Sequence, residues 1–156
     1  MTPETDAAMS LSDRIESAMR DAMRARDERR TVTLRMAMAA AHNLKIARGR
    51  DLTDEEVIDV IGKQVKQRRE SIAMYRDAGH EERAVAEEAE AAILAEFLPQ
   101  QLTENEVESL ARAAIADTGA TSSADLGRVM GRLSPQTRGR ADGRLVSEVV
   151  RRLLAG

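Results

Sequence analysis

The stretch "EFLPQQLTENEV", Glu96 to Val107, decides how the chain is divided. Pro99 cannot continue a helix, because it has no backbone N–H and its ring clashes with the preceding turn. Thr103 and Glu106 follow three residues apart, which is the spacing of a capping box that opens a new helix. The link "LPQQLT" is therefore predicted to be a domain boundary, with one domain in residues 1–98 and a second in residues 102–156.

Before this boundary the apolar residues recur with the period of helices. A second capping box, Thr53 with Glu56, is predicted to open a long helix, and Gly49 ends the helix before it. The sequence thus predicts an N-terminal domain of about four helices, the first from near Ser10 and the others over about residues 28–47, 53–79 and 81–98.

After the boundary the chain predicts a small tail domain of three shorter helices. The first starts at Thr103, the second follows a loop in which Ser122 or Ser123 supplies the N-cap, and Asp142 caps the last. No run of alternating apolar and polar residues is long enough to indicate a strand. The predicted fold class is therefore all-α.

Two neighbouring helices carry dense charge. The run "EERAVAEEAEAAILAE", Glu81 to Glu96, is interpreted as a solvated face opposite an apolar stripe, and a cation site or a nucleic-acid mimic are the alternatives. In "KQVKQRRE", Lys63 to Glu70, a pair between Lys66 and Glu70 favours an exposed charged face over a binding face. The stripe expected to point inward from the acidic run is Val85, Ala92, Ile93 and Phe97.

Composition excludes several classes of protein. The 156 residues include no cysteine, which excludes disulfides, thiolate metal sites and a cysteine nucleophile. Tyr75 and Phe97 are the only aromatic residues, so the core must be aliphatic. The N-terminal "MTPETDAAMSLSD" is too polar for a signal peptide or a membrane span. We expect a cytoplasmic protein that does not bind a membrane.

Charge is distributed unevenly along the chain. Lys and Arg number 24 against 27 Asp and Glu, but residues 80–117 hold 2 basic and 10 acidic residues, whereas residues 118–156 hold 7 basic and 3 acidic ones. An acidic middle is thus followed by a basic end. The arginines of this end that we take as candidates for nucleic-acid binding are Arg128, Arg132, Arg138, Arg140 and Arg144.

The segment between the last two predicted helices suits an anionic ligand. Gly139 and Gly143 allow the backbone to approach a ligand closely, and the N–H groups at a helix start favour an anion. Arginines beside such a start are suited to phosphate. In the alternative interpretation the glycines only shape a turn, Asp142 only caps the helix, and the arginines pair with the acidic middle of the chain.

Three segments in order resemble a known family. They are "KQVKQRRESIAMYRDAG", "AEFLPQQLTENEV" and "SADLGRVMGRLSPQTRGRADGRLVSEVV", and they look like the YqeY-like (GatB/YqeY) family, related to the C-terminal tail of the GatB subunit of the Asp/Glu-tRNA amidotransferase. The resemblance covers nearly all of the chain from Ser10 to Leu154. Basic positions that are usually lysine in the family are arginine here, at Arg128, Arg138 and Arg140.

The resemblance implies an all-helical protein with a tail domain that holds tRNA or a tRNA-handling complex. It also carries the family's label of carbon–nitrogen ligase activity with glutamine as amide donor, which belongs to the whole GatB enzyme. We expect shape and phosphate recognition of folded RNA, because aromatic residues for base stacking are absent from the basic segment.

The residues themselves indicate no catalytic site. His42 and His80 stand alone, without further metal ligands at a defined spacing, and no glycine-rich phosphate loop follows a strand. We therefore expect no metal, no cofactor and no catalysis by the chain alone. Two other functions stay open: a protein interaction module that uses the acidic helix and apolar residues of the N-terminal domain, and an amide-transfer enzyme.

Overall fold

The structure is a computed structural model that describes residues 9–156. Most of the N-terminal stretch on which the expectation of no signal peptide rests lies outside the described residues. The described chain forms seven α-helices and one short 3₁₀ helix, without a strand in residues 9–156. The predicted all-α class is confirmed.

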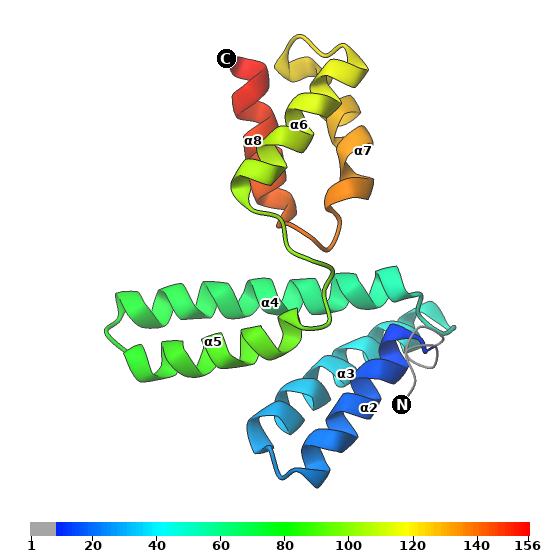
Figure 1. Cartoon of the computed structure of the whole chain (residues 1–156), viewed down its shortest axis with the longest axis vertical. Helices are drawn as coiled ribbons and strands as arrows, with labels where there is room; N and C mark the ends of the chain where they lie inside the picture. The colour runs from blue at the N-terminus through cyan, green and yellow to red at the C-terminus, as the bar shows by residue number, and fades with distance from the viewer. Residues whose placement is uncertain (1–8) are drawn as a thin grey trace. The chain divides into compact units, whose positions relative to one another are not determined.

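The chain separates into two compact units (Figure 1). The first extends to Leu98 and the second comprises Pro99–Gly156. Each unit has a hydrophobic core of its own, and no residue belongs to both cores.

Four helices form the first unit: α2 (Leu11–Arg24), α3 (Glu28–Arg48), α4 (Asp54–Asp77) and α5 (Glu81–Ala95). Side-chain caps set three of their starts, because Ser10, Asp27 and Thr53 each accept a hydrogen bond from a backbone N–H in the first turn. The predicted box of Thr53 and Glu56 is present in both directions. At Gly49 the backbone is left-handed, with φ of 71°, and α3 ends there as predicted.

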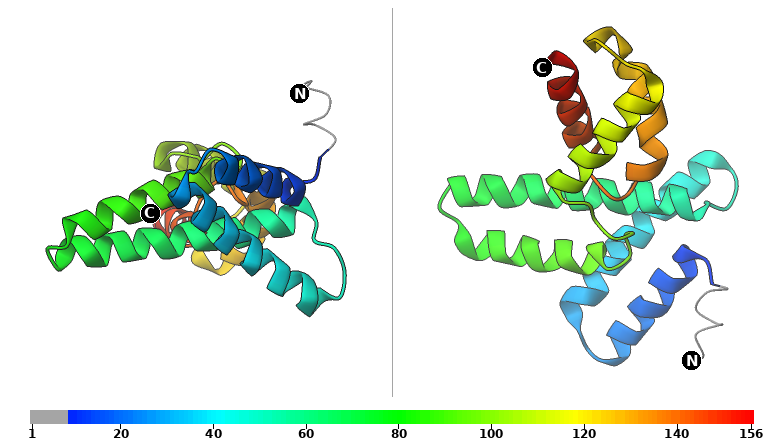
Figure 2. Two further views of the ribbon diagram at one scale, coloured as in Figure 1. Left: turned by 90° about the horizontal axis from the view of Figure 1, so that it is seen from below. Right: turned by 45° about the horizontal axis from the view of Figure 1, so that its top comes forward.

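The helices of the first unit pack as two pairs. α4 and α5 lie side by side as an antiparallel hairpin, and α2 lies against α3 (Figures 1 and 2). The pairs share one aliphatic core, whose buried residues are Leu11, Ile15, Leu34, Ala37, Val57, Ile61, Val65 and Leu94.

The inward face predicted for α5 is wrong in part. Val85 is 52% exposed and Ala92 is exposed as well, whereas Ala84 and Leu94 are buried. In the observed orientation of α5, Ile93 and Phe97 pack against the core as expected, and the buried face also carries the half-buried carboxylate of Glu87.

An arginine of α4 explains that orientation. Arg68 is only 12% exposed, and its guanidinium pairs with Glu87, at 3.2 Å, and with Glu90. Arg76 joins the same two helices through Glu88 at 2.5 Å. The acidic run is therefore not simply a solvated face, because part of it neutralises the arginines of α4.

The second unit packs three helices around the second core: α6 (Glu104–Thr118), α7 (Leu126–Thr137) and α8 (Gly143–Ala155). The 3₁₀ helix η1 (Ser123–Asp125) leads into α7. Thr103 and Glu106 form the predicted capping box of α6, and Asp142 caps α8. The buried core residues are Val107, Ala111, Ala114, Val129, Leu133, Val146, Val149 and Val150.

Candidate nucleic-acid interface

The five candidate arginines belong to α7, α8 and the turn between them. α7 continues through Pro135 to Thr137, and the turn that follows contains Gly139 with φ of 73°. This left-handed backbone requires glycine, because a side chain would be strained there. Gly143 is the first residue of α8, and the space beside it is open.

Arg140 is engaged within the unit. Its Nε donates to the carbonyl oxygen of Gln100 at 3.1 Å, and a terminal guanidinium nitrogen donates to that of Gln136 at 3.3 Å. Its own carbonyl accepts from Leu102 N at 2.7 Å. Gln101 adds a hydrogen bond to the carbonyl of Gly139 at 2.8 Å. Arg140 thus fastens the start of the unit to the turn between α7 and α8.

Arg128 and Arg132 project from α7 to the surface, with side chains 58% and 61% exposed. Arg128 pairs with Asp125 at 3.1 Å and Arg132 with Asp117 at 3.6 Å. The backbone N–H groups of Thr121 and Ser122, with Arg128, hold the pKa of the Asp125 carboxyl below its usual value. Exposed pairs of this kind contribute less than about 1 kcal/mol, so both guanidinium groups remain available to a ligand.

Arg144 lies in the first turn of α8 and is exposed. Its backbone N–H donates to the Asp142 carboxylate at 3.0 Å, so the positive end of this helix already faces a carboxylate. Its guanidinium has no ion-pair partner among residues 9–156.

The arginines lie in two parts of the unit rather than in one cluster. Arg138, Arg140 and Arg144 lie at or beside the turn, whereas Arg128 lies ten residues before Arg138, or about 15 Å along the chain at helical rise. The alternative interpretation, in which the arginines pair with the acidic middle of the chain, holds for Arg132, because it pairs with Asp117.

Sequence reasoning missed Arg151. This residue is exposed on α8, seven positions after Arg144, and a spacing of seven places both side chains on one helix face. Neighbouring Arg152 differs, because it pairs with Glu108 of α6 at 3.3 Å. The helical spacing from Arg144 was the signal that could have found Arg151.

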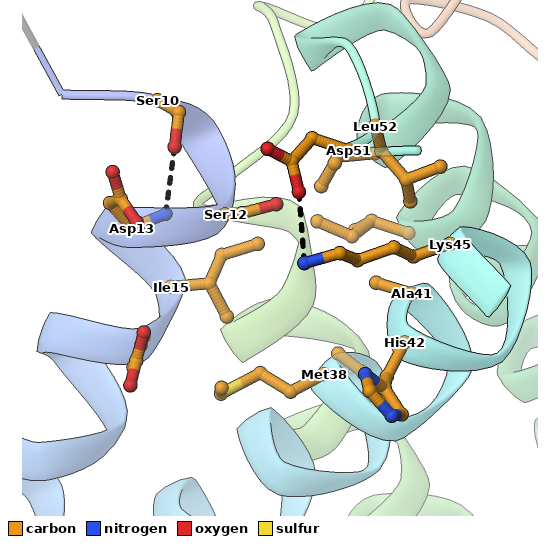
Figure 3. A pocket seen from close by; sticks show the side chains of 14 residues that line it. Ser10, Ser12, Asp13, Ile15, Met38, Ala41, His42, Lys45, Asp51 and Leu52 are labelled. Atoms are coloured by element: carbon orange, nitrogen blue, oxygen red, sulfur yellow. Dashed lines mark hydrogen bonds and ion pairs between the residues drawn. The ribbon is translucent and has the colours of Figure 1, made fainter. Parts of the chain in front are cut away.

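A separate pocket of about 530 Å³ lies in the first unit, between α2, the end of α3 and the start of α4 (Figure 3). Figure 3 shows Lys45 reaching from α3 to the Asp51 carboxylate, which is 2.9 Å away, with Ser12 and Ile15 of α2 across from them. This pair raises the pKa of Lys45 and lowers that of Asp51. The volume of the pocket suits a small molecule. His42 also lines the pocket, without a hydrogen bond to the serine hydroxyls there.

Residues 9–156 contain no group of three or more His, Cys, Asp or Glu side chains placed to hold a metal ion. None of their helices is both long enough and apolar enough to cross a membrane.

A family model described as Yqey-like protein matches residues 12–154. The chain belongs to the YqeY-like family. The match extends over both units of this YqeY-like protein, and it confirms the resemblance indicated by the three sequence segments. No curated protein matches the chain in a sequence comparison. The family description names no substrate, partner or reaction.

Proposed function

We propose that this YqeY-like protein is an accessory protein whose second unit docks on tRNA, or on a tRNA-handling complex, through its exposed arginines. The observation that carries the proposal is the surface exposure of Arg128, Arg132 and Arg144, which the core of the unit does not use. The resemblance to the GatB tail supports tRNA as the RNA.

Phosphate recognition fits this surface better than base recognition. Arginine offers planar paired donors to phosphate oxygens, and the basic segment carries 7 basic residues against 3 acidic ones. Both aromatic residues of the chain, Tyr75 and Phe97, belong to the first unit, so the second has no ring on which a base can stack. The surface is therefore suited to the shape and phosphates of a folded RNA.

Arg140 is assigned a structural part in this proposal, because its donors are held by carbonyl groups. Arg138 at the turn and Arg151 on α8 are exposed as well and add to these arginines. We place amide-transfer chemistry in the partner complex, because guanidinium groups bind and position phosphates and supply neither a nucleophile nor a base.

The experiment is fluorescence anisotropy of labelled bulk tRNA across a salt series. We expect micromolar or tighter binding that weakens as salt rises, and we expect the triple variant R128A/R132A/R144A to lose most of it. The slope of log K against log salt should fall by about one for each arginine removed from a phosphate. The matched control is R14A/R20A/R24A, which removes three exposed arginines of α2.

Equal loss in both triple variants would show general charge attraction and would contradict the assigned surface. Unchanged binding in R128A/R132A/R144A would remove these arginines from the proposal. Glutamine-dependent amide formation by the purified chain with charged tRNA and ATP would contradict the accessory role.

A further inference from the structure

α3 carries a second apolar face that points away from the core. Val32, Met36, Ala39, Asn43 and Ile46 follow one another at helical spacing and are all exposed, and we call this set the α3 stripe. The three large apolar side chains are 45%, 54% and 65% exposed at Val32, Met36 and Ile46. Only Asn43 interrupts the apolar character of the row.

The opposite face of the same helix already packs in the core, through Leu34 and Ala37. A surface helix normally has polar residues on the side away from the core. α3 is instead apolar on two sides, and contiguous exposed apolar surface on a protein marks an interaction site. Within residues 9–98 the stripe is therefore left without an apolar partner helix.

Three arginines and one carboxylate, that of Glu28, lie around the stripe, so the charge there is positive on balance. Arg29 and Arg35 lie on its two sides, and Arg26 lies in the turn before α3. None of the three has an ion-pair partner in the described part of the chain, whereas nearby Arg24 and Arg30 are paired.

The position of these charges on the helix adds to their effect. The start of a helix is its positive end, where cations are disfavoured unless an anion is near. The Asp27 carboxylate is held by the N–H of Arg30 as the cap, which leaves Glu28 as the carboxylate of the first turn. The start of α3 is thus basic beyond what its own acidic residues offset.

The acidic residues Glu87 and Glu90 of α5 do not neutralise the arginines beside the stripe. Beside the stripe, a guanidinium nitrogen of Arg68 lies 4.0 Å from the sulfur of Met36. That same guanidinium holds Glu87 and Glu90. These two carboxylates of α5 are therefore already paired with a cation.

We propose that the α3 stripe docks an amphipathic helix of another protein, with apolar residues at helical spacing and carboxylates at the end that lies over Arg26, Arg29 and Arg35. The stripe runs for about 21 Å, which suits a partner helix of about four turns. Ala39 at its centre allows the two helices to approach closely. An antiparallel partner also opposes the helix dipoles favourably.

A second copy of the chain fits less well. An antiparallel pairing of two α3 helices centred on Ala39 sets Arg35 opposite Asn43 and Arg29 opposite Gly49, so neither arginine gains a carboxylate. A parallel pairing sets like charges together. An acidic partner helix covers the apolar row and also supplies carboxylates to the arginines. This surface belongs to the first unit and does not depend on the RNA proposal.

The test uses the full chain and a labelled 18-residue designed peptide, with a leucine stripe flanked by glutamates, against the same peptide with lysines in place of the glutamates. We expect the wild-type protein to bind the glutamate peptide at least tenfold more tightly than the lysine peptide. V32S/I46S should lose at least tenfold in affinity. The matched control M74S/V85S changes two apolar residues on α4 and α5 that are at least as exposed, and it should bind as the wild type does.

A charge reversal makes the test specific. R29E/R35E should prefer the lysine peptide, and circular dichroism should show an unchanged helical content in all variants. Equal binding of the two peptides by the wild type, or equal loss in M74S/V85S, would overturn the proposal. So would a dimer in sedimentation that V32S/I46S dissociates, or preferential binding to phosphatidylserine vesicles over the glutamate peptide.

Discussion

At the scale of single residues, the five candidate arginines divide by what their donors contact. Arg140 gives its guanidinium to two backbone carbonyls, whereas Arg144 presents its guanidinium to solvent. Similar positions in the sequence thus have different parts in the molecule. The difference can be measured by stability alone, before any ligand is known.

We predict that R140A destabilises the second unit by about 1–2 kcal/mol, because two carbonyls lose a charged donor. R144A should change the free energy of unfolding by less than about 0.5 kcal/mol, as is usual for exposed positions. Urea unfolding followed by circular dichroism measures both. Equal stability of the two variants would show that the Arg140 contacts contribute nothing.

The lowered pKa of Glu56 predicts how the stability of the first unit changes in acid. Hydrogen bonds from Arg50, and then from the N–H of Thr53, lower the pKa of its carboxyl to about 2, from an ordinary value of 4.5. A lowered pKa in the folded state stabilises the fold above the unfolded value, and this stabilisation is lost as the pH falls from about 4.5 to about 2.

The variant E56Q should therefore be less stable than the wild type at pH 7, and the gap should narrow as the pH approaches 2. Thermal unfolding at several pH values between 2 and 7 checks this. A gap that stays constant over that range would contradict a role for the ionised carboxylate.

At the scale of elements, the α4–α5 hairpin depends on a charge held between the two helices. We predict that R68A destabilises the first unit by about 2 kcal/mol, less than the 3–5 kcal/mol typical of a fully buried pair, since Glu87 and Glu90 would face each other without a cation. The control R69A removes an exposed arginine from the next position. Similar unfolding midpoints for R68A and R69A would argue against the contribution of the pair.

Helix starts could be predicted from sequence because their signals are local. Thr53 and Glu56, or Thr103 and Glu106, are three residues apart, and each box forms as expected. The orientation of α5 could not be read in this way, because it depends on contacts with Arg68 of the preceding helix, 19 and 22 residues from Glu87 and Glu90. The sequence did hold a signal for the Arg68–Glu90 pair. Residues equally far from the turn of an antiparallel hairpin lie opposite one another, and both residues lie 11 positions from Gly79 at the turn.

For the candidate site, too, local sequence signals could be read, whereas contacts between distant residues could not. Charge counting found the arginines of the second unit, because net positive charge is visible in the sequence. It could not separate Arg140 from the others, since its acceptor at Gln100 is a backbone carbonyl 40 residues away, and every residue has one. The α3 stripe was hidden for a related reason: one apolar row on a helix looks like core until packing shows which face is buried.

At the scale of the whole molecule, the two hydrophobic cores share no residue, although the family match spans both. We therefore propose that the two units are domains that unfold independently. The chain provides a matched pair of probes, because Thr53 and Thr103 occupy the same position in the same capping box, one in each unit.

We predict two transitions in calorimetry of the full chain. Replacing an N-cap threonine by alanine costs about 1 kcal/mol, which corresponds to a fall in Tm of about 4–8 °C for a unit of this size. T53A should lower only the transition of the first unit and T103A only that of the second, because each cap stabilises a helix that packs in one core. A single transition that both variants lower equally would show that the two cores unfold as one cooperative body.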